Sequence, residues 1–201
     1  MAEITVERGN LRIRRMSNDP ADVALMSGWL TDPRVLEFYE GRDRPFDERL
    51  VREKYAPRAE GGPVVPCIIE EGTAVGAWSP IGYIQFYPVG PADAPEYGLD
   101  EADGVYGLDL FLGVPEKWGK GLGTGALRLM LAHLFETRGA RRVVVDPHVD
   151  NPRAIRAYEK VGFRAVKRLP AHEWYEGRMV DCWLMVAERP GPTGTGPDGA
   201  E

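Results

Sequence analysis

The sequence predicts a single domain of the α/β class, an α+β arrangement in which helices cover the faces of a mixed sheet. Three observations lead to this prediction. The chain has 201 residues, which is enough for one well-buried core. Its N-terminal half contains several segments in which apolar residues alternate as in antiparallel strands. Its C-terminal half then follows the order β-α-β-α-β.

The composition excludes several classes of protein. Hydrophobic residues make up 43% and charged residues 28% of the chain, and no apolar run approaches the roughly 18–20 residues that span a bilayer. The N-terminal stretch MAEITVERGNLRIRR has no apolar core of the secretory type, so we expect a cytoplasmic protein with no membrane partner. The net charge of −6 argues against a nucleic-acid partner and is compatible with cationic small molecules or basic proteins.

Neither the cysteines nor the histidines form a metal-binding motif. Cys67 and Cys182 lie far apart in apolar surroundings, which predicts two reduced core thiols. His133, His148 and His172 show no i, i+4 pair and no framework of carboxylates that would hold zinc. We therefore expect no metal site.

The first part of the chain predicts a strand and two helices. Residues 11–16 alternate apolar and basic side chains and indicate an edge strand. Asp19 is a candidate N-cap, and Pro20 follows it at the first position of a helix. A second short helix around FDERLVREKY should end before Pro57.

Two antiparallel strands and an acidic loop should come next. The segments VVPCIIEE and IGYIQFYPV predict the neighbouring strands. Residues 90–104 have no periodicity and include Glu96 and Asp100. This segment predicts either a solvated excursion or a lid that attracts cations.

The remaining segments alternate between strands and helices. VYGLDLFLGV predicts a buried strand, and after a glycine-rich turn a helix follows that Arg138 and Gly139 should end. A strand, a helix and two more strands follow at RRVVVD, NPRAIRAYEKV, FRAVKRL and MVDCWLMVA. We expect one domain over residues 1–188 and a disordered tail rich in Pro and Gly over 189–201.

The stretch EKWGKGLGTGALRLML, residues 116–131, predicts an anion site. The first amides of a helix have no partner within it, and the helix dipole is positive there, so phosphate is the natural ligand. Three alternatives compete with this interpretation. A plain turn needs no ligand, a Walker loop requires a lysine directly after its second glycine, and a Rossmann fingerprint is matched formally by Gly121, Gly123 and Ala126. Too few βαβ units surround the motif for a Rossmann domain.

The segment KGLGTGALRLMLAHLF, with DNPRAIRAYEKVGFRAV after the next strand, resembles the acetyl-CoA-binding half of the GNAT superfamily of N-acetyltransferases. In that family the pattern R/Q-x-x-G-x-G/A wraps the pyrophosphate of coenzyme A, and N-x-x-A-x-x-x-Y-x-K-x-G-F closes the other side. The second pattern is matched at Asn151, Ala154, Tyr158, Lys160, Gly162 and Phe163. The resemblance implies a twisted, mostly antiparallel sheet that is splayed at the acetyl-CoA site and has helices on both faces.

The resemblance also implies the residues that bind acetyl-CoA. Trp118 stands where the family usually has Arg or Gln, so that side-chain contact would be lost or would move to Lys117 or Lys120. Asn151 would cap its helix and bond the pantetheine amides. The expected cofactor residues are Leu110, Phe111, Leu112, Trp118, Gly119, Lys120, Gly121, Leu122, Gly123, Thr124, Asn151, Ala154 and Tyr158.

Over most of residues 10–165 the resemblance is strongest to the aminoglycoside 6′-N-acetyltransferases, which implies direct transfer to an amine in a ternary complex. An amine attacks a thioester only as the free base, so a carboxylate must hold the ammonium group and accept its proton. Asp109, within VYGLDLFLGV, is the candidate base. The alternative is an aspartate that faces solvent or bonds a neighbouring strand.

The other expected site residues follow from the same resemblance. Tyr158 matches the tyrosine that offers a proton to the sulfur of coenzyme A, although it is also compatible with a core tyrosine. A backbone amide near Leu110 to Leu112 would stabilise the oxyanion. Asp146 would bind the acceptor or cap the following turn. The expected substrate-binding residues are Tyr39, Gln85, Tyr87, Glu96, Asp100, Asp109 and Asp146.

Three functions remain open at the level of the sequence. The leading one is acetylation of an aminoglycoside antibiotic at its 6′-amine, which confers resistance. The second is acetylation of a protein N-terminus, a ribosomal protein or N-hydroxylysine in siderophore synthesis. The third is a non-catalytic acyl-CoA sensor, which would need neither Asp109 nor Tyr158. A monomer and a homodimer are both compatible with the sequence.

Overall fold

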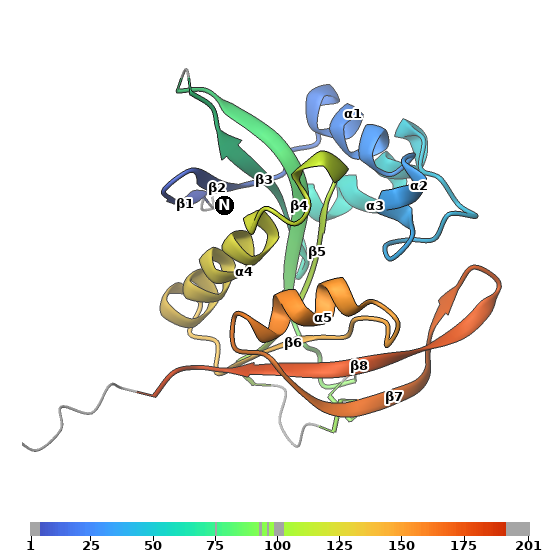
Figure 1. The fold of residues 1–201 in the computed structure, drawn as a ribbon, viewed down its shortest axis with the longest axis vertical. Helices are drawn as coiled ribbons and strands as arrows, with labels where there is room; N and C mark the ends of the chain where they lie inside the picture. The colour runs from blue at the N-terminus through green and yellow to red at the C-terminus, as the bar shows by residue number, and fades with distance from the viewer. Residues whose placement is uncertain (1–4, 75, 93, 96, 99–102, 192–201) are drawn as a thin grey trace, which may run out of the picture.

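One sheet of eight strands runs through the computed structural model, which describes residues 5–191 except 75, 93, 96 and 99–102 (Figure 1). The strand order is β1-β2-β3-β4-β5-β6-β8-β7, and all these neighbours are antiparallel except the parallel pair β5 and β6. The predicted mixed α/β class is confirmed. The strands are β1 Thr5–Arg8, β2 Leu11–Arg15, β3 Val65–Gly72, β4 Trp78–Pro88, β5 Val105–Leu112, β6 Arg142–Val145, β7 Arg164–Tyr175 and β8 Arg178–Glu188.

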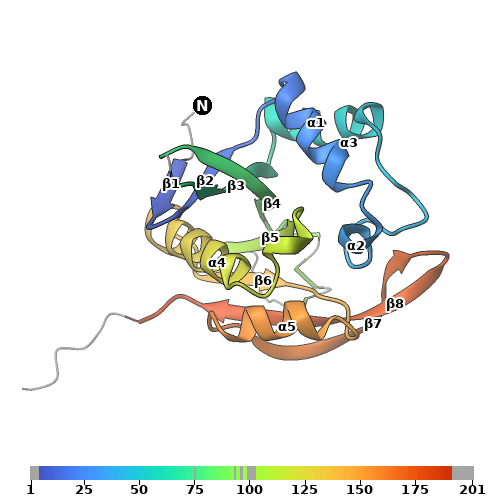
Figure 2. The same ribbon diagram turned by 45° about the horizontal axis from the view of Figure 1, so that its top comes forward.

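Helices cover both faces of this sheet (Figure 2). The helices α1, α2 and α3 lie on one side, and α4 and α5 lie on the other. Helix α4 continues into a π-helical turn at His133–Thr137, which ends at Arg138 as the sequence predicts. None of the described helices is long and apolar enough to cross a membrane. The helices are α1 Pro20–Trp29, α2 Pro33–Leu36, α3 Glu48–Glu60, α4 Leu122–Ala132 and α5 Pro152–Glu159.

The two faces of β5 belong to different apolar cores. Leu108 is buried in the cluster that contains α4, and Leu110 and Leu112 pack against the same cluster. Phe111 is buried in the opposite cluster, among residues of α1, α2 and α3. Since side chains alternate along a strand, Asp109 shares the face of Phe111. The alternation predicted from the sequence is confirmed.

Two predictions about individual elements are wrong. Strand β2 does not lie at the edge of the sheet, because β1 pairs with its outer side. Helix α3 does not end before Pro57 but continues to Glu60. A proline in a helix removes one hydrogen bond, yet Tyr55 and Ala56 are buried just before it, and this tertiary packing keeps the helix intact. The extra turn places Arg58 beside the site described below.

Strand β5 extends beyond its parallel neighbour β6. The pairing joins Val105–Gly107 to Arg142–Val144, and from there β5 continues to Leu112 paired with β4. The amide of Gly113, just after β5, donates to the carbonyl of Ile81 within β4. Backbone amides of successive residues point alternately to the two neighbouring strands. Since the amide of Gly113 points to β4, the amides of Leu110 and Leu112 point away from it. The sheet is therefore splayed at this point, as the sequence resemblance implies.

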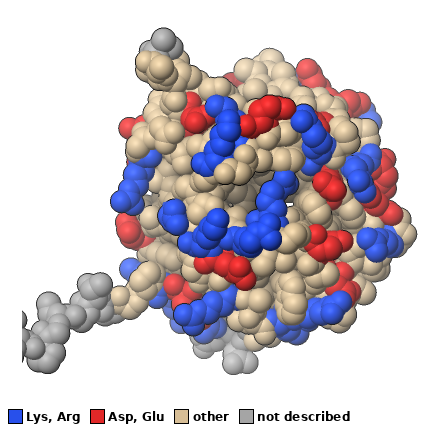
Figure 3. All heavy atoms as spheres, in the orientation of Figure 1, with Lys and Arg blue, Asp and Glu red and all other residues tan. Residues whose placement is uncertain are grey.

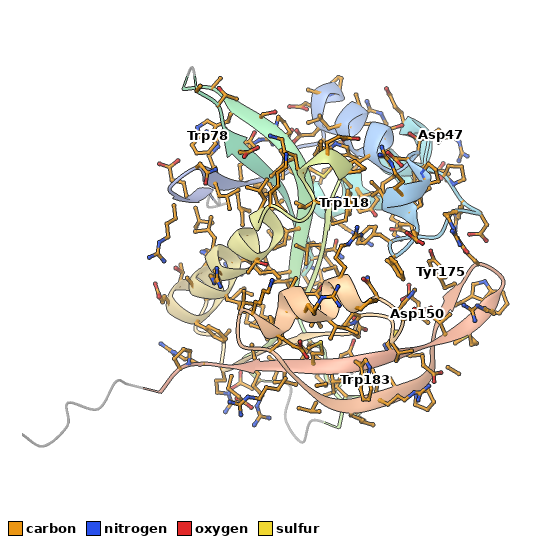
Figure 4. All side chains as sticks on the ribbon, in the orientation of Figure 1. Asp47, Trp78, Trp118, Asp150, Tyr175 and Trp183 are labelled. Carbon is orange, nitrogen blue, oxygen red and sulfur yellow. The ribbon has the colours of Figure 1, made fainter. Side chains whose placement is uncertain are left out.

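The hairpin of β7 and β8 supports the segment after α2. Figure 4 shows Tyr175 near the tip of this hairpin, where its hydroxyl donates to the carbonyl of Leu36 at 2.9 Å. Arg42 and Glu176 form a salt bridge at 2.7 Å. These contacts hold the segment between Leu36 and Arg42, which carries three residues of the candidate site, against the sheet.

Candidate active site

A hollow lies at the splay, between the glycine-rich turn before α4 and the helix α5. We call it the turn pocket; its volume is about 330 Å³. Twelve of the thirteen residues that the sequence predicts for the cofactor line it, and Lys120 does not. In the space-filling view, Lys and Arg side chains surround the hollow centre of this face (Figure 3). The cations that line the pocket are Lys117, Arg153, Arg156 and Lys160.

The glycine-rich turn exposes helix amides to the turn pocket. Gly119 and Gly121 have φ values of 73° and 81°, a left-handed conformation that side chains other than that of glycine rarely adopt. Gly121 is the N-cap of α4 and supplies no side-chain hydrogen bond. The amides of Leu122, Gly123 and Thr124 therefore lack a partner within the helix, at a helix end that attracts anions. These three residues line the turn pocket, as an anion site requires.

Trp118 anchors the turn to the end of β5 (Figure 4). Its indole Nε1 donates to the carbonyl of Leu112 at 2.9 Å. The guanidinium carbon of Arg153, from α5, lies 3.8 Å from the centroid of the indole ring, a close cation–π contact. Trp118, which departs from the family pattern, thus holds the guanidinium group of Arg153 from α5.

Neither Lys117 nor Lys120, which were expected to replace the Arg or Gln contact with the cofactor, lies free in the turn pocket. Lys117 lines the turn pocket, but its Nζ pairs with Glu71 at 2.6 Å. Lys120 is exposed and does not line the pocket. Arg153 and Arg156, to which the sequence analysis gave no role, do line it. Their spacing of three places them on one face of α5, and this was the signal in the sequence that could have found them.

A second pocket, of about 290 Å³, adjoins the turn pocket. We call it the acid pocket, because the carboxylates Glu40, Asp109, Asp146 and Glu173 line it against the cations Lys54 and Arg58. The predicted residues Tyr39, Gln85, Tyr87, Asp109 and Asp146 are all in its wall, and Glu96 and Asp100 lie outside the described residues. The two pockets share Phe38, Tyr39, Leu110, Asn151, Ala154 and Tyr158.

Asp109 lies in the acid pocket next to this junction. Its Oδ2 accepts a hydrogen bond of 2.6 Å from Nε2 of Gln85 on the neighbouring strand β4. For that oxygen, the alternative of an aspartate that bonds a neighbouring strand is correct. Its other oxygen, Oδ1, has no hydrogen-bond partner among the described residues. Burial raises the pKa of Asp109 to about 6, and the charge of Asp146 acts in the same direction. Such a carboxylate is ionised at neutral pH and is a stronger base than an ordinary aspartate.

Tyr158 joins the core and both pockets. It is only 7% exposed, and its ring packs edge-on against Phe163 with the centroids 5.4 Å apart. Burial and the charges of Asp109 and Asp146 raise the pKa of Tyr158 well above its usual value. The hydroxyl therefore stays protonated at neutral pH and is a hydrogen-bond donor rather than a base. Both interpretations of this residue, core packing and a role in the pocket, agree with its position.

Asp146 follows β6 and is bound by side chains from other parts of the chain. Its Oδ2 lies 2.9 Å from Nε2 of His172 on β7. The hydroxyl of Tyr97 donates to the same oxygen over a longer distance of 3.4 Å. Asp146 is thus held in the wall of the acid pocket by β7 and by the loop after β4.

Five charged or polar residues of the acid pocket had no predicted role. Glu40 pairs with Lys54 at 2.6 Å, and Nε2 of His148 lies 2.8 Å from a carboxylate oxygen of Glu173. Arg58 donates to Oε1 of Gln85 at 2.7 Å. Lys54 and Arg58 lie one turn apart on α3. The others come from separate elements of the fold, so no local pattern in the sequence connects them with α3.

Within the described residues, His148, Glu173 and Cys182 form one group of possible metal ligands, with ligand atoms within 4.8 Å of one another. Burial raises the pKa of the Cys182 thiol to about 12. A thiol that stays protonated is a poor metal ligand, because metals bind the thiolate. The expectation of no metal stays a prediction.

A splayed mixed sheet with an anion-binding turn at the splay, and a buried carboxylate beside it, is typical of enzymes that use an acyl-coenzyme A donor. A family model described as an acetyltransferase (GNAT) domain matches residues 19–170. Aminoglycoside N(6′)-acetyltransferase type 1 of Klebsiella pneumoniae is 32% identical over 162 residues, which cover 80% of this chain and 77% of that protein. The chain belongs to the GNAT superfamily of N-acetyltransferases.

Solved structures of two acetyltransferases share the fold. Aminoglycoside acetyltransferase AAC(6′)-Ib, solved in complex with coenzyme A and kanamycin, superposes with a TM-score of 0.67 at 29% identity, over 89% of this chain and 95% of that chain. Spermidine N-acetyltransferase from Vibrio cholerae, solved with CoA and spermine, gives a TM-score of 0.72 at 16% identity, over 90% and 97%. The second similarity shows the fold alone.

Proposed function

We propose that this acetyltransferase moves the acetyl group of acetyl-CoA to the 6′-amine of an aminoglycoside, by direct attack in a ternary complex. One observation carries the proposal: a cationic pocket with free helix amides meets a pocket with four carboxylates at Leu110 and Tyr158, next to Asp109. The first pocket suits a phosphorylated donor, and the second suits an acceptor with several positive charges. Similarity to the aminoglycoside N(6′)-acetyltransferase of Klebsiella pneumoniae supports the choice of acceptor.

The residues of the turn pocket fit coenzyme A. The amides of Leu122 to Thr124 and the cations of α5 would hold its pyrophosphate. The amides of Leu110 and Leu112 point away from β4 and would pair with the pantetheine arm or with the thioester oxygen. The side chain of Asn151 accepts from the amide of Ala154 and caps α5, as predicted, which leaves its amide nitrogen for pantetheine.

The reaction then follows from the groups at the junction. Asp109 takes a proton from the acceptor ammonium, and the free amine attacks the thioester carbon. A backbone amide near Leu110 stabilises the oxyanion as the C–N bond forms. The C–S bond breaks as the hydroxyl of Tyr158 gives its proton to the departing sulfur, and Tyr158 takes up in return the proton that the attacking nitrogen must lose to become an amide. Asp146 and Glu173 hold other ammonium groups of the acceptor.

The experiment is a coenzyme A release assay with acetyl-CoA and a panel of acceptors. Kanamycin and ribostamycin are compared with spermidine, a basic N-terminal peptide and N-hydroxylysine. We expect the highest kcat/KM for an aminoglycoside, because only a rigid polycation meets several carboxylates of the acid pocket together. A higher kcat/KM for the peptide, for spermidine or for N-hydroxylysine would show that this compound, and not an aminoglycoside, is the preferred acceptor. Acetyl-CoA binding without turnover of any acceptor would favour a sensor.

Arg153→Ala should raise the KM for acetyl-CoA by about tenfold, because a charge-assisted hydrogen bond to a phosphate contributes about 1.5–3 kcal/mol. The KM for the acceptor should change little, since Arg153 does not line the acid pocket. Initial rates over a range of acetyl-CoA concentrations measure the change. Arg164→Ala, on the exposed start of β7 outside both pockets, is the matched control. An unchanged KM in Arg153→Ala would show that Arg153 only stacks on Trp118.

A further inference from the structure

A network of three hydrogen bonds around Gln85 connects helix α3 to Asp109. Nη1 of Arg58 donates to Oε1 of Gln85 at 2.7 Å, and the hydroxyl of Tyr83 donates to the same oxygen at 2.7 Å. Nε2 of Gln85 donates to Oδ2 of Asp109 at 2.6 Å. Gln85 is only 7% exposed and Tyr83 is fully buried, so water does not compete freely for these bonds. Both ends of the Gln85 amide are occupied by protein groups.

Arg58 determines which way the Gln85 amide points. A guanidinium group has only donors, so it can bond Oε1 of Gln85 but not its NH₂ group. If the amide were turned over, its NH₂ would face Arg58, and its oxygen would face the ionised Asp109. The bond from Arg58 therefore keeps the donor end of Gln85 on Oδ2 of Asp109. Oδ1 of Asp109 is left for the ammonium group of the acceptor.

We propose that Arg58, acting through Gln85, is a positioning residue that holds Asp109 in its ionised, correctly oriented form. This inference rests on the proposed function, in which Asp109 is the general base. It also gives Gln85 a different role from the predicted contact with the acceptor, because Gln85 orients the base.

The charges around Asp109 agree with this role. Asp146 and Glu173 raise the pKa of Asp109, whereas Arg58 and the bond from Gln85 lower it and oppose the larger effect of burial. The other ionisable groups of the pocket also contact one another, Lys54 with Glu40 and His148 with Glu173. The surrounding tyrosines have pKa values well above their usual range and stay neutral; they are Tyr39, Tyr83, Tyr87 and Tyr158. Arg58 is thus the cation whose loss should raise the pKa of Asp109.

The test is a pH titration of the Asp109 carboxyl carbon by ¹³C NMR in the full-length protein, with the resonance assigned by its absence in Asp109→Asn. Arg58→Met keeps most of the apolar stem but removes the charge and the donors. It should raise the pKa of Asp109 by at least about half a unit. Arg58→Lys keeps a charge and a donor and should restore most of the difference. Arg49→Met, on the exposed side of the same helix, is the matched control and should leave the pKa unchanged.

The pH dependence of kcat/KM for kanamycin should shift in the same variants in which the pKa of Asp109 shifts. Its acid limb should move to higher pH in Arg58→Met by the shift that NMR measures, while the KM for acetyl-CoA stays unchanged. A merely structural role would lower the unfolding temperature without moving this limb. If Arg58→Met does not fold, Gln85→Leu removes the donor to Oδ2 of Asp109 itself and should raise the pKa of Asp109 too.

The outcomes separate this inference from the proposed function. If Asp109→Asn retains full turnover, Asp109 is not the base, and both proposals are wrong. If Asp109→Asn loses turnover while the folded Arg58→Met and Gln85→Leu proteins keep the pKa of Asp109 and the acid limb, only the role of Arg58 is overturned.

Discussion

Asp109→Asn should lower kcat with kanamycin at neutral pH by about 100-fold or more, because the variant has lost the group that accepts the ammonium proton. The substitution keeps the size of the side chain, and the new amide oxygen can still accept from Nε2 of Gln85. The fold and the turn pocket should therefore be unchanged. Steady-state rates and the Kd for acetyl-CoA, measured on the same preparation, distinguish loss of the base from loss of the donor site.

The pH profile of the wild-type protein provides a second check on Asp109. Its pKa is raised to about 6, so kcat/KM for the acceptor should rise as pH increases through 6 and the carboxylate becomes ionised. This limb should be absent from the residual activity of Asp109→Asn. A variant that keeps both the wild-type kcat and the same limb would show that Asp109 has only a structural role.

Tyr158→Phe should have the second-largest effect, a reduction of kcat by about tenfold or more, because the departing thiolate loses its proton donor. The KM for acetyl-CoA should change little, since the ring and its packing on Phe163 remain. The hydroxyl has no hydrogen-bond partner among the described residues, so its removal should leave the unfolding temperature nearly unchanged. Single-turnover rates with excess enzyme report on the chemical step directly. An unchanged single-turnover rate would assign Tyr158 to the core alone.

The predicted site residues that line the two pockets are those specified by local chemistry. Glycine in a left-handed conformation is required at Gly119 and Gly121, and Asn151 is a favourable N-cap, so short motifs reveal these positions. The same is true of the alternation that turns Asp109 toward one face of β5. Local rules also placed most of the strands and helices.

The remaining site residues depend on contacts between distant segments. Arg58 reaches Gln85 because α3 continues through Pro57, against the local preference of proline. Glu40 and Glu173 enter the acid pocket because the hairpin of β7 and β8 packs on the segment after α2. Such tertiary contacts leave no pattern in a short window of sequence, so neither the network around Asp109 nor two of the four carboxylates could be predicted.

Trp118 is an intermediate case. The sequence identified it as a departure from the family pattern, which places a polar side chain there. It could not show that Arg153, 35 positions later, stacks on the indole ring and lines the same pocket. Arg153 thus provides a cation beside the glycine-rich turn, although the side chain at position 118 carries no charge.

The position of the new amide bond on kanamycin tests the central claim most directly. After complete reaction with ¹³C-acetyl-CoA, NMR of the product identifies the nitrogen that carries the acetyl group. We expect one product, acetylated at the 6′-amine, because the acid pocket would hold the other ammonium groups away from the thioester. Acetylation at a different amine, or unreacted kanamycin in the presence of a protein that binds acetyl-CoA, would contradict it.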